Sequence, residues 1–579
     1  MPAVRSSERS TLARIAPFLV LAVSFLAYAA VSSFGFVYDD EGQIIHDSFV
    51  QHWRFFPAYF VSHVWQYVVP HALGNYYRPV FLTWLLLNFK LFGLHAAGWH
   101  LAVVFLHLIV TWQVYRLALV LLDNQPAALV TAALFGLHPV HIEAVAWVSG
   151  ATEPLAAVFV LGSLLSYIAY RKQGRHTTYV LALLCFTLAV LTKETAVLLP
   201  VVLFAYDLLL RGQQPGPGER IRGSFLRLVP FGSLVGVYLI ARYHALHALT
   251  RQIVNIDART TLLTIPSVLA FYARLLLLPV RLSAFYDTPY ITTAPAALWP
   301  AIGCVVVAGI AVALLWRFRS RAAGFAVVLL LFPLLPLMKL SVFPQGELAH
   351  DRYLYLPSIG FALLLGLLAQ VIAKNSRPSK QRVWTACAGI LCILYFYGTL
   401  TQSLYWANDL VLYVRGVQLA PNNLVARTDL GAELMARGRT DLAMDEYRNV
   451  LHRDPQYWLA RYNLGYAEYA TNDCASAAHD LEIAAAEVPT DAESMFYLGH
   501  CRFQLGDRRT GIALMRRGIQ LDPRIANFRA QLADDLVLTD VPENLQTALQ
   551  LYRTEAAANP AHPTAARRAE ALAARLDVR

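Results

Sequence analysis

The chain has 579 residues, of which 57% are hydrophobic and only 15% are charged. A soluble globular domain carries about 25% charged residues, so this composition excludes a soluble protein over most of the length and predicts a membrane protein. The net charge of +10 is spread over separate short segments rather than gathered on one face, which excludes a nucleic-acid-binding surface.

Long apolar runs recur as far as about residue 404, and most are close to the ~20 residues that a membrane-spanning helix needs. We therefore predict an all-α chain in which residues 1–404 form a polytopic membrane helix bundle. About eleven spans are expected, near residues 15–34, 98–121, 127–138, 154–170, 178–192, 195–210, 228–243, 298–316, 323–338, 353–373 and 384–404. Two further runs, 79–93 and 263–280, contain Lys90 and Arg274 and are expected to be interfacial helices on the membrane surface.

The basic residues of this membrane part indicate its orientation. They cluster in five short segments, which are residues 1–14, 171–175, 211–227, 317–321 and 374–382. Basic loops stay on the cytoplasmic side, so Asp39 and the carboxyl-terminal part of the chain are expected on the outward face. The Arg- and Ala-rich composition, without signals for a eukaryotic organelle, favours a bacterial inner-membrane protein whose carboxyl-terminal part lies in the periplasm.

Ionisable residues outside the basic segments gather at the outward ends of the predicted spans. They are Asp39, Asp40, the segment 138–147, Lys193, Glu194, Arg274, Asp287 and the segment 350–357. Charged groups at span ends are costly to bury and are usually functional, although each one could simply solvate a loop end. Their gathering on one face favours a functional site.

Residues 405–579 contain no long apolar run, and their 19 Arg and 23 acidic residues give a net charge of −4. Two independent marks repeat with a 34-residue step, namely Pro421, Pro455, Pro489 and Pro523 and the Leu-Gly pairs at 430–431, 464–465 and 498–499. This is the period of tetratricopeptide repeats, which stack as helix pairs. We predict a repeat domain over 405–559, with repeats at 424–457, 458–491 and 492–525, a degenerate fourth at 526–559, and a tail over 560–579.

Such arrays form concave surfaces that bind peptides or proteins, but this array could instead only brace or dimerise the protein. Cys474 and Cys501 lie within it, and the sequence leaves open whether they pack as free thiols or form a disulfide.

Several short motifs, in this order, carry a resemblance to a known family. They are FVYDDEGQI, NYYRPVFLTWLLL, LHPVHIEAVAWVSGATEPLAA, LTKETAVLLP, YARLLLLPVRLSAFYD and HDRYLYLPSIGF, followed by the repeats. The chain resembles the transmembrane and tetratricopeptide-repeat-containing O-mannosyltransferases, relatives of the protein O-mannosyltransferases in the GT-C glycosyltransferase superfamily. The resemblance implies a polyprenyl- or dolichyl-phosphate sugar donor, often mannose, and an inverting transfer at the outward membrane face to a protein or glycan acceptor.

Transfer to a hydroxyl needs a base for its proton and groups that stabilise the leaving phosphate. Asp39 aligns with the first acid of the family's acidic pair, so the resemblance implies that it is the general base, with Asp40 orienting the acceptor or sharing the role. For the phosphate, Arg352 is the first candidate, followed by Lys193 and Arg78, because a guanidinium matches phosphate oxygens.

Further candidates for substrate binding are Glu194, Glu153, Tyr353 and the residues of one outward loop, His138, His141 and Glu143. The two histidines could bond sugar or phosphate, hold the loop, or bind a metal, for which no third ligand is evident. Asp287 could contact the donor or cap a turn. No cofactor is expected, and the resemblance argues against a divalent metal.

Two other classes of protein compete with a glycosyltransferase. A non-enzymatic membrane scaffold would use the repeats to recruit partners, and would tolerate the loss of Asp39. A transporter or flippase would favour charges at the middle of broken helices, whereas the charges here gather at one end of the spans.

Overall fold

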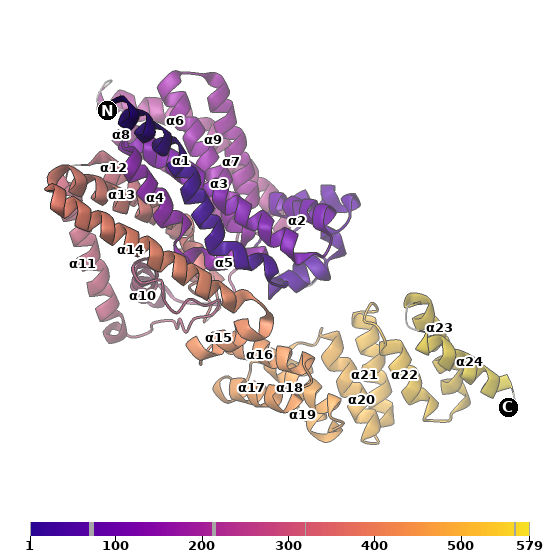
Figure 1. Ribbon diagram of the computed structural model, residues 1–579. Coiled ribbons are helices and arrows are strands. Elements are labelled where there is room, and N and C mark those ends of the chain that lie inside the picture. The colour runs from indigo at the N-terminus through magenta and orange to yellow at the C-terminus, as the bar shows by residue number, and fades with distance from the viewer. Residues whose placement is uncertain are drawn as a thin grey trace. The chain divides into compact units, whose positions relative to one another are not determined.

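The computed structural model describes residues 2–68, 74–210, 216–318, 320–344, 346–560 and 563–577. Across these residues the chain forms helices and no strand, as predicted for an all-α protein. The chain divides into two compact units, residues 1–421 and 422–579 (Figure 1). Parts of the predicted basic segments 1–14, 211–227 and 317–321 lie outside the described residues.

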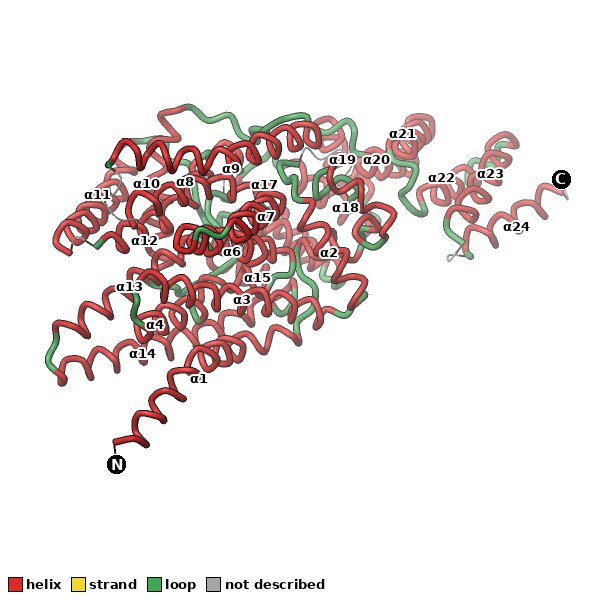
Figure 2. Tube along the Cα trace, turned by 90° about the horizontal axis from the view of Figure 1, so that it is seen from above, coloured by secondary structure: helices red, strands yellow, loops and turns green. Residues whose placement is uncertain are grey.

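The first unit is a bundle of helices that lie side by side (Figures 1 and 2). They are α1 (Pro2–Tyr28), α2 (Pro79–Phe92), α3 (Ala96–Leu122), α4 (Gln125–Gly136), α5 (Ile142–Ala146), α6 (Thr152–Gln173), α7 (His176–Thr192), α8 (Leu199–Leu210), α9 (Pro217–Leu246), α10 (Ala258–Leu277), α11 (Ala294–Phe318), α12 (Arg321–Leu331), α13 (Pro357–Asn375), α14 (Pro378–Ser403) and α15 (Asp409–Leu419). Helix α4 packs against α3 and α13, and α1 packs against α3, α4 and α14.

The number of spans differs from the prediction of about eleven. Among the described residues, eight helices are long and apolar enough to cross a membrane, namely Ala13–Ser33, Ala96–Leu122, Ser149–Gln173, Gly218–Leu246, Ala258–Leu277, Arg321–Met338, Pro357–Asn375 and Pro378–Trp406. A bent pair, Gln125–Gly136 with Pro139–Ala146, adds a ninth if it is one span, and its two parts meet at 48°. The bend falls at His138, whose ψ of 123° is the extended conformation that a following proline imposes.

Four expected elements depart from the prediction. The run 298–316 lies in α11, where the apolar stretch found among the described residues, Ala294–Val307, is shorter than a span. The run 195–210 forms a short 3₁₀ segment, η7 (Glu194–Leu198), and the 12-residue α8, which together are not a regular span. The run 178–192 lies in α7, which has only 17 residues. The run 263–280, expected on the membrane surface, lies in α10, whose 20 residues are sufficiently long and apolar to cross it. The predicted surface helix 79–93 is the 14-residue α2, too short to span.

The second unit is the predicted array of helix pairs. It contains α16 (Leu424–Ala436), α17 (Thr440–Arg453), α18 (Trp458–Ala470), α19 (Cys474–Glu487), α20 (Ala492–Gln504), α21 (Arg508–Leu521), α22 (Phe528–Val537), α23 (Pro542–Ala558) and α24 (Thr564–Asp577). The Leu-Gly mark has a packing reason, because a Cβ on Gly499 would lie 2.7 Å from the Gly511 carbonyl oxygen. The two helices of that repeat therefore approach backbone to backbone.

The unit boundaries differ from the predicted ones at both ends of the array. Helix α15 belongs to the first unit, where the Asp409 carboxylate accepts a hydrogen bond from Tyr38 N–H at 2.8 Å and Gly416 lies against Phe285. At the other end, the predicted tail contains α24, whose Leu572 is buried in the same apolar cluster as α22 and α23. The array therefore begins after 421 and continues through α24.

Candidate active site

The two adjacent aspartates follow α1 in a sharply turned loop. Tyr38, directly before them, has a φ of +57°, a conformation that is uncommon for a bulky residue and marks a constrained backbone. Its ring lies against Trp147 and Phe285, with centroids 5.5 and 5.7 Å away. This turn allows Asp39 and Asp40 to point in different directions.

Asp40 is fully buried and is bound by the protein itself. One carboxylate oxygen accepts hydrogen bonds from Ser149 N–H at 2.8 Å and from the Ser149 hydroxyl at 2.6 Å, and the other accepts one from Val37 N–H at 3.3 Å. Burial raises the pKa of Asp40 to about 7, although the Ser149 hydrogen bonds oppose this shift. Asp40 therefore ties the loop after α1 to the loop before α6.

Asp39 instead lines a polar cavity. No hydrogen bond to its carboxylate occurs among the residues that the structure describes. Burial raises the pKa of Asp39 to about 6, and the nearby positive charge of Arg352 opposes the shift. At neutral pH such a carboxylate is mostly ionised and still basic enough to accept a proton.

Three ion pairs surround this cavity, and each joins elements far apart in the sequence. Glu194, in η7, accepts two hydrogen bonds from the Arg78 guanidinium, at 2.7 and 3.1 Å. Lys193 pairs with Glu153 at the start of α6, and Arg352, in η10 (Asp351–Leu354), pairs with Glu143 of α5.

Burial and ion pairing together set the pKa values of these charged residues. Burial alone would raise the pKa of Glu194, but Arg78 outweighs it and lowers that pKa to about 2. Burial, together with the positive charges of Arg78 and Arg352, lowers the pKa of Lys193 below its ordinary value. Burial lowers the pKa of Arg352, but its Glu143 partner more than offsets this, so the pKa is raised. The guanidiniums keep their charge within the site.

The cavity measures about 70 Å³ and opens beside a larger groove. Predicted residues that line the cavity are Asp39, Arg78, Glu153, Lys193, Arg352 and Tyr353. The groove, of about 480 Å³, shares Arg78, Lys193 and Tyr353 with the cavity and adds Glu194, Arg242 and Lys339. The rest of the groove is mostly apolar, with Val197, Leu239, Leu335 and Leu337 among its lining residues.

Five predicted site residues line neither space, namely Asp40, which is bound by Ser149, and His138, His141, Glu143 and Asp287. His138 and His141 are buried between helices, where their Nε2 atoms lie 3.1 Å from the Leu276 carbonyl oxygen and 2.8 Å from the Ser358 hydroxyl. They hold neighbouring segments together, so the expectation that they contact sugar or phosphate is not supported by their position. Glu143 lies beneath Arg352, and Asp287 is exposed on a loop.

Sequence reasoning missed several residues of the site. Trp147, Tyr76 and Trp65 line the cavity, and Arg352 and Arg78 stack on Trp147 and Tyr76 at 5.3 and 4.5 Å from the ring centroids. Tyr76 and Trp147 lie within the quoted motifs, so the sequence offered a signal for them, whereas Trp65 lies outside every motif.

Polar contacts of its neighbours fix the segment that carries Arg352. The Tyr286 hydroxyl donates to Asp351 at 2.6 Å, and His350 Nε2 lies 2.9 Å from Glu347. Burial and the neighbouring Glu143 raise the pKa of Asp351. Within the described part of the chain, no three His, Cys, Asp or Glu side chains gather as a metal site, and a metal-independent reaction remains a prediction.

Fold and site together define a multi-pass helical membrane protein with a charged cavity at the ends of its helices and a tetratricopeptide-repeat array. Residues 77–216 match the family profile of dolichyl-phosphate-mannose-protein mannosyltransferases, and residues 428–492 and 462–526 match the tetratricopeptide repeat.

Curated relatives with similar sequences carry the same kind of name. The chain is 25% identical to protein O-mannosyl-transferase F38B6.6 of Caenorhabditis elegans, over 76% of this chain and 63% of that protein. It is 25% identical to Tmtc1 of Drosophila melanogaster and 26% identical to TMTC1 of Homo sapiens, covering 76% and 77% of this chain and 62% and 56% of those proteins. The predicted resemblance to these O-mannosyltransferases is confirmed.

The chain spans about 56–63% of the length of these three relatives. All three come from animals, so they give no support to the compositional expectation of a bacterial inner-membrane protein.

Proposed function

We propose that the protein is a GT-C-type membrane glycosyltransferase that moves a sugar from a polyprenyl-phosphate carrier to a hydroxyl acceptor. Mannose is the first candidate for the sugar. The observation that carries the proposal is the Asp39 carboxylate, which faces the cavity while Asp40 is held by Ser149. The names of the relatives and the matching mannosyltransferase profile support the same reaction class.

The reaction is an inverting displacement. The acceptor hydroxyl gives its proton to Asp39 as its oxygen attacks the anomeric carbon of the sugar from the face opposite the leaving group. The bond between the anomeric carbon and the phosphate oxygen breaks, and the carrier departs as a lipid phosphate. Negative charge develops on that phosphate, next to Arg78 and Lys193, which border both the cavity and the groove.

The groove suits the lipid carrier. Its apolar lining matches a polyprenyl chain, and its basic residues match a phosphate at the head of that chain. Arg242 is held in place, because its guanidinium donates to the Asn75 carbonyl at 2.7 Å and to the Leu249 carbonyl at 2.9 Å. Lys339 is exposed on the groove wall, where it is available to a phosphate.

The repeat array supplies a surface for partner peptides, which include a protein acceptor bearing Ser or Thr hydroxyls. Tyr466, Tyr469 and Tyr497 lie within 4.8–6.1 Å of one another, centroid to centroid, on α18 and α20. Partly exposed tyrosines present broad, rigid contact area together with polar groups, which suits peptide recognition. We place this array and Asp39 on the same, extracytoplasmic side of the membrane.

The transfer itself is the decisive experiment. Membranes containing the protein are given radiolabelled polyprenyl-phosphate-mannose and a Ser/Thr-rich acceptor peptide, and label in the peptide is measured against membranes without the protein. Label transferred in proportion to the protein supports the proposal. If neither mannose nor any other polyprenyl-phosphate hexose is consumed, the non-enzymatic scaffold is the better account.

Deletion of residues 422–579 tests the division of labour between the two units. If the array delivers the acceptor, transfer to peptide falls while hydrolysis of the donor persists. Loss of both activities with retained expression would instead show that the array supports the membrane unit.

A further inference from the structure

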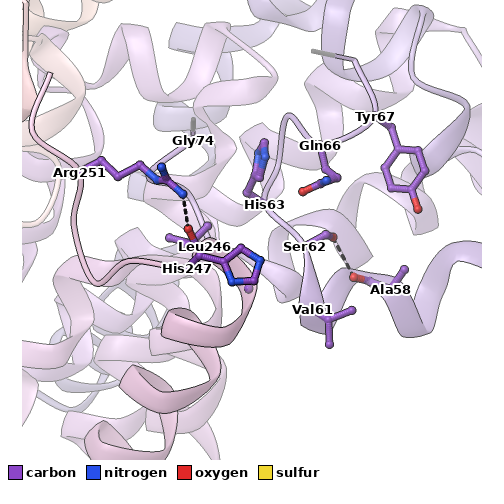
Figure 3. Close-up of a pocket in the computed structure, with 11 residues that line it drawn as sticks. Ala58, Val61, Ser62, His63, Gln66, Tyr67, Gly74, Leu246, His247 and Arg251 are labelled. Atoms are coloured by element: carbon purple, nitrogen blue, oxygen red, sulfur yellow. Dashed lines mark hydrogen bonds between the residues drawn. The ribbon is translucent and has the colours of Figure 1, made fainter. Parts of the chain in front are cut away.

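A second polar pocket lies at the carboxyl-terminal end of α9 (Figure 3). It shares no lining residue with the cavity that Asp39 lines. It measures about 360 Å³. One side is the segment after η4 (Trp53–Val61), which contributes Ser62, His63 and Gln66, and the other is the end of α9 and its following loop, which contribute His247 and Arg251. None of the described residues that line it is acidic.

His63 offers a hydrogen-bond donor to this pocket. The side chain is only 7% exposed, and its Nδ1 accepts a hydrogen bond from Trp65 N–H at 3.2 Å. This contact assigns the proton of the neutral ring to Nε2. Burial, and the positive charge of Arg251, lower the pKa of His63. No described residue accepts a hydrogen bond from Nε2, so this donor is available to a ligand.

Arg251 brings a positive charge that no described carboxylate neutralises. Its Nη2 donates to the Leu246 carbonyl at 2.6 Å (Figure 3). Its main chain exchanges two hydrogen bonds with the Asn75 side chain, at 2.8 and 3.0 Å. The guanidinium is therefore anchored, and its Nε is buried without a partner. Anchoring reduces the entropy that a ligand would otherwise have to overcome.

We propose that this pocket binds a phosphate group, carried either by a phospholipid headgroup or by a water-soluble phosphate ester. The pocket favours an anion, because it offers the Arg251 guanidinium without a counter-ion, the His63 N–H and the Gln66 amide, and no acidic side chain among its described lining. A guanidinium fork matches the oxygens of a phosphate. Val61 and Tyr67 on the pocket wall are 67% and 43% exposed, which places apolar surface where the tails of a lipid would leave the pocket.

The phosphate pocket and the cavity of Asp39 share one wall, which is the segment 63–66. His63 and Gln66 line the phosphate pocket, whereas Val64 and Trp65, which lie between them in the sequence, line the cavity of Asp39. The Val64 N–H also bonds to the carbonyl of Tyr76, another cavity residue, at 3.0 Å. A bound phosphate therefore stabilises the wall against which the sugar is transferred, and this role does not depend on which sugar is used.

The test is a binding measurement on the full chain, purified in a phosphate-free maltoside detergent. Thermal unfolding is followed while inorganic phosphate, dioctanoyl phosphatidylglycerol or, as a phosphate-free control, dioctanoylglycerol is added. We expect a saturable rise in Tm with at least one phosphate compound and none with dioctanoylglycerol. A response to inorganic phosphate identifies a soluble ester as a sufficient ligand, and a response to phosphatidylglycerol alone identifies the membrane as the source.

Two variants and one matched control locate the binding. Arg251→Gln removes the charge, and His63→Asn keeps an acceptor near the Nδ1 position while removing the Nε2 donor. Each is expected to weaken binding about tenfold or more. Arg259→Gln, an exposed residue in the first turn of α10 outside the pocket, is expected to bind like the parent protein. Absence of any phosphate response in the parent protein, or an unchanged response in both pocket variants, overturns the proposal.

Discussion

Replacement of Asp39 by asparagine separates the proposed enzyme from a scaffold. Asparagine has the same shape but accepts no proton at neutral pH. Because no described residue donates a hydrogen bond to the Asp39 carboxylate, the replacement leaves no protein partner unsatisfied. General-base catalysis contributes about 10²–10⁴ in rate, so transfer should fall at least 10²-fold, equivalent to about 2.7 kcal/mol of barrier.

The same variant should not lower stability. The pKa of Asp39 is about 6 in the fold, against an ordinary value of 3.8. The folded protein thus holds this proton more tightly than the unfolded chain, and the ionised carboxylate destabilises the fold at neutral pH. This destabilisation decreases as the pH falls from about 6 toward 4, because the Asp39 carboxylate becomes protonated. Asp39→Asn removes it, so its Tm at pH 7 should equal or exceed that of the parent.

The assay is initial-rate transfer of labelled mannose to peptide, with Tm measured on the same preparations. The matched control is Asp257→Asn, because Asp257 is an exposed cap of α10 whose Oδ1 contact with Thr260 N–H asparagine also makes. In the parent protein, activity should decline below about pH 6 as Asp39 becomes protonated. Full activity in Asp39→Asn, or an equal loss in Asp257→Asn, would refute the assignment of the base.

Three further variants test how the structure is held. Ser149→Ala removes the hydroxyl hydrogen bond to the buried Asp40 and keeps the main-chain one. It should lower the free energy of unfolding by about 1–3 kcal/mol, measured as a fall in Tm with reduced transfer. Glu143→Gln leaves the partly buried Arg352 guanidinium without its counter-charge and should cost about 3 kcal/mol in the same measurement. Gly499→Ala forces apart two helices of one repeat and should cost about 1–3 kcal/mol, seen as earlier proteolysis of the array while donor hydrolysis is unchanged.

Features that repeat along the chain were readable from the sequence alone. The 34-residue step of Pro421, Pro455, Pro489 and Pro523 predicted the helix pairs of the array, because each repeat folds mainly against its neighbours. Long apolar runs predicted a multi-pass membrane unit, since the bilayer sets the length of a span. They did not fix the number of spans, because a break such as that at His138 depends on local backbone geometry that hydropathy does not report.

The sequence brought Asp39 and Asp40 to one place but did not distinguish them. Neighbouring residues share a pattern, and only their distant partners give them different roles. Ser149 stands 109 positions from Asp40, and Glu143 stands 209 from Arg352, so these contacts exist only once the helices have packed. The tertiary structure therefore decided which carboxylate faces the cavity. It also placed His138 between helices, where its ring contacts the Leu276 carbonyl. The tertiary structure also determined which charged groups are paired. A charged group buried without a partner is costly, and the packing of the helices decides which groups meet.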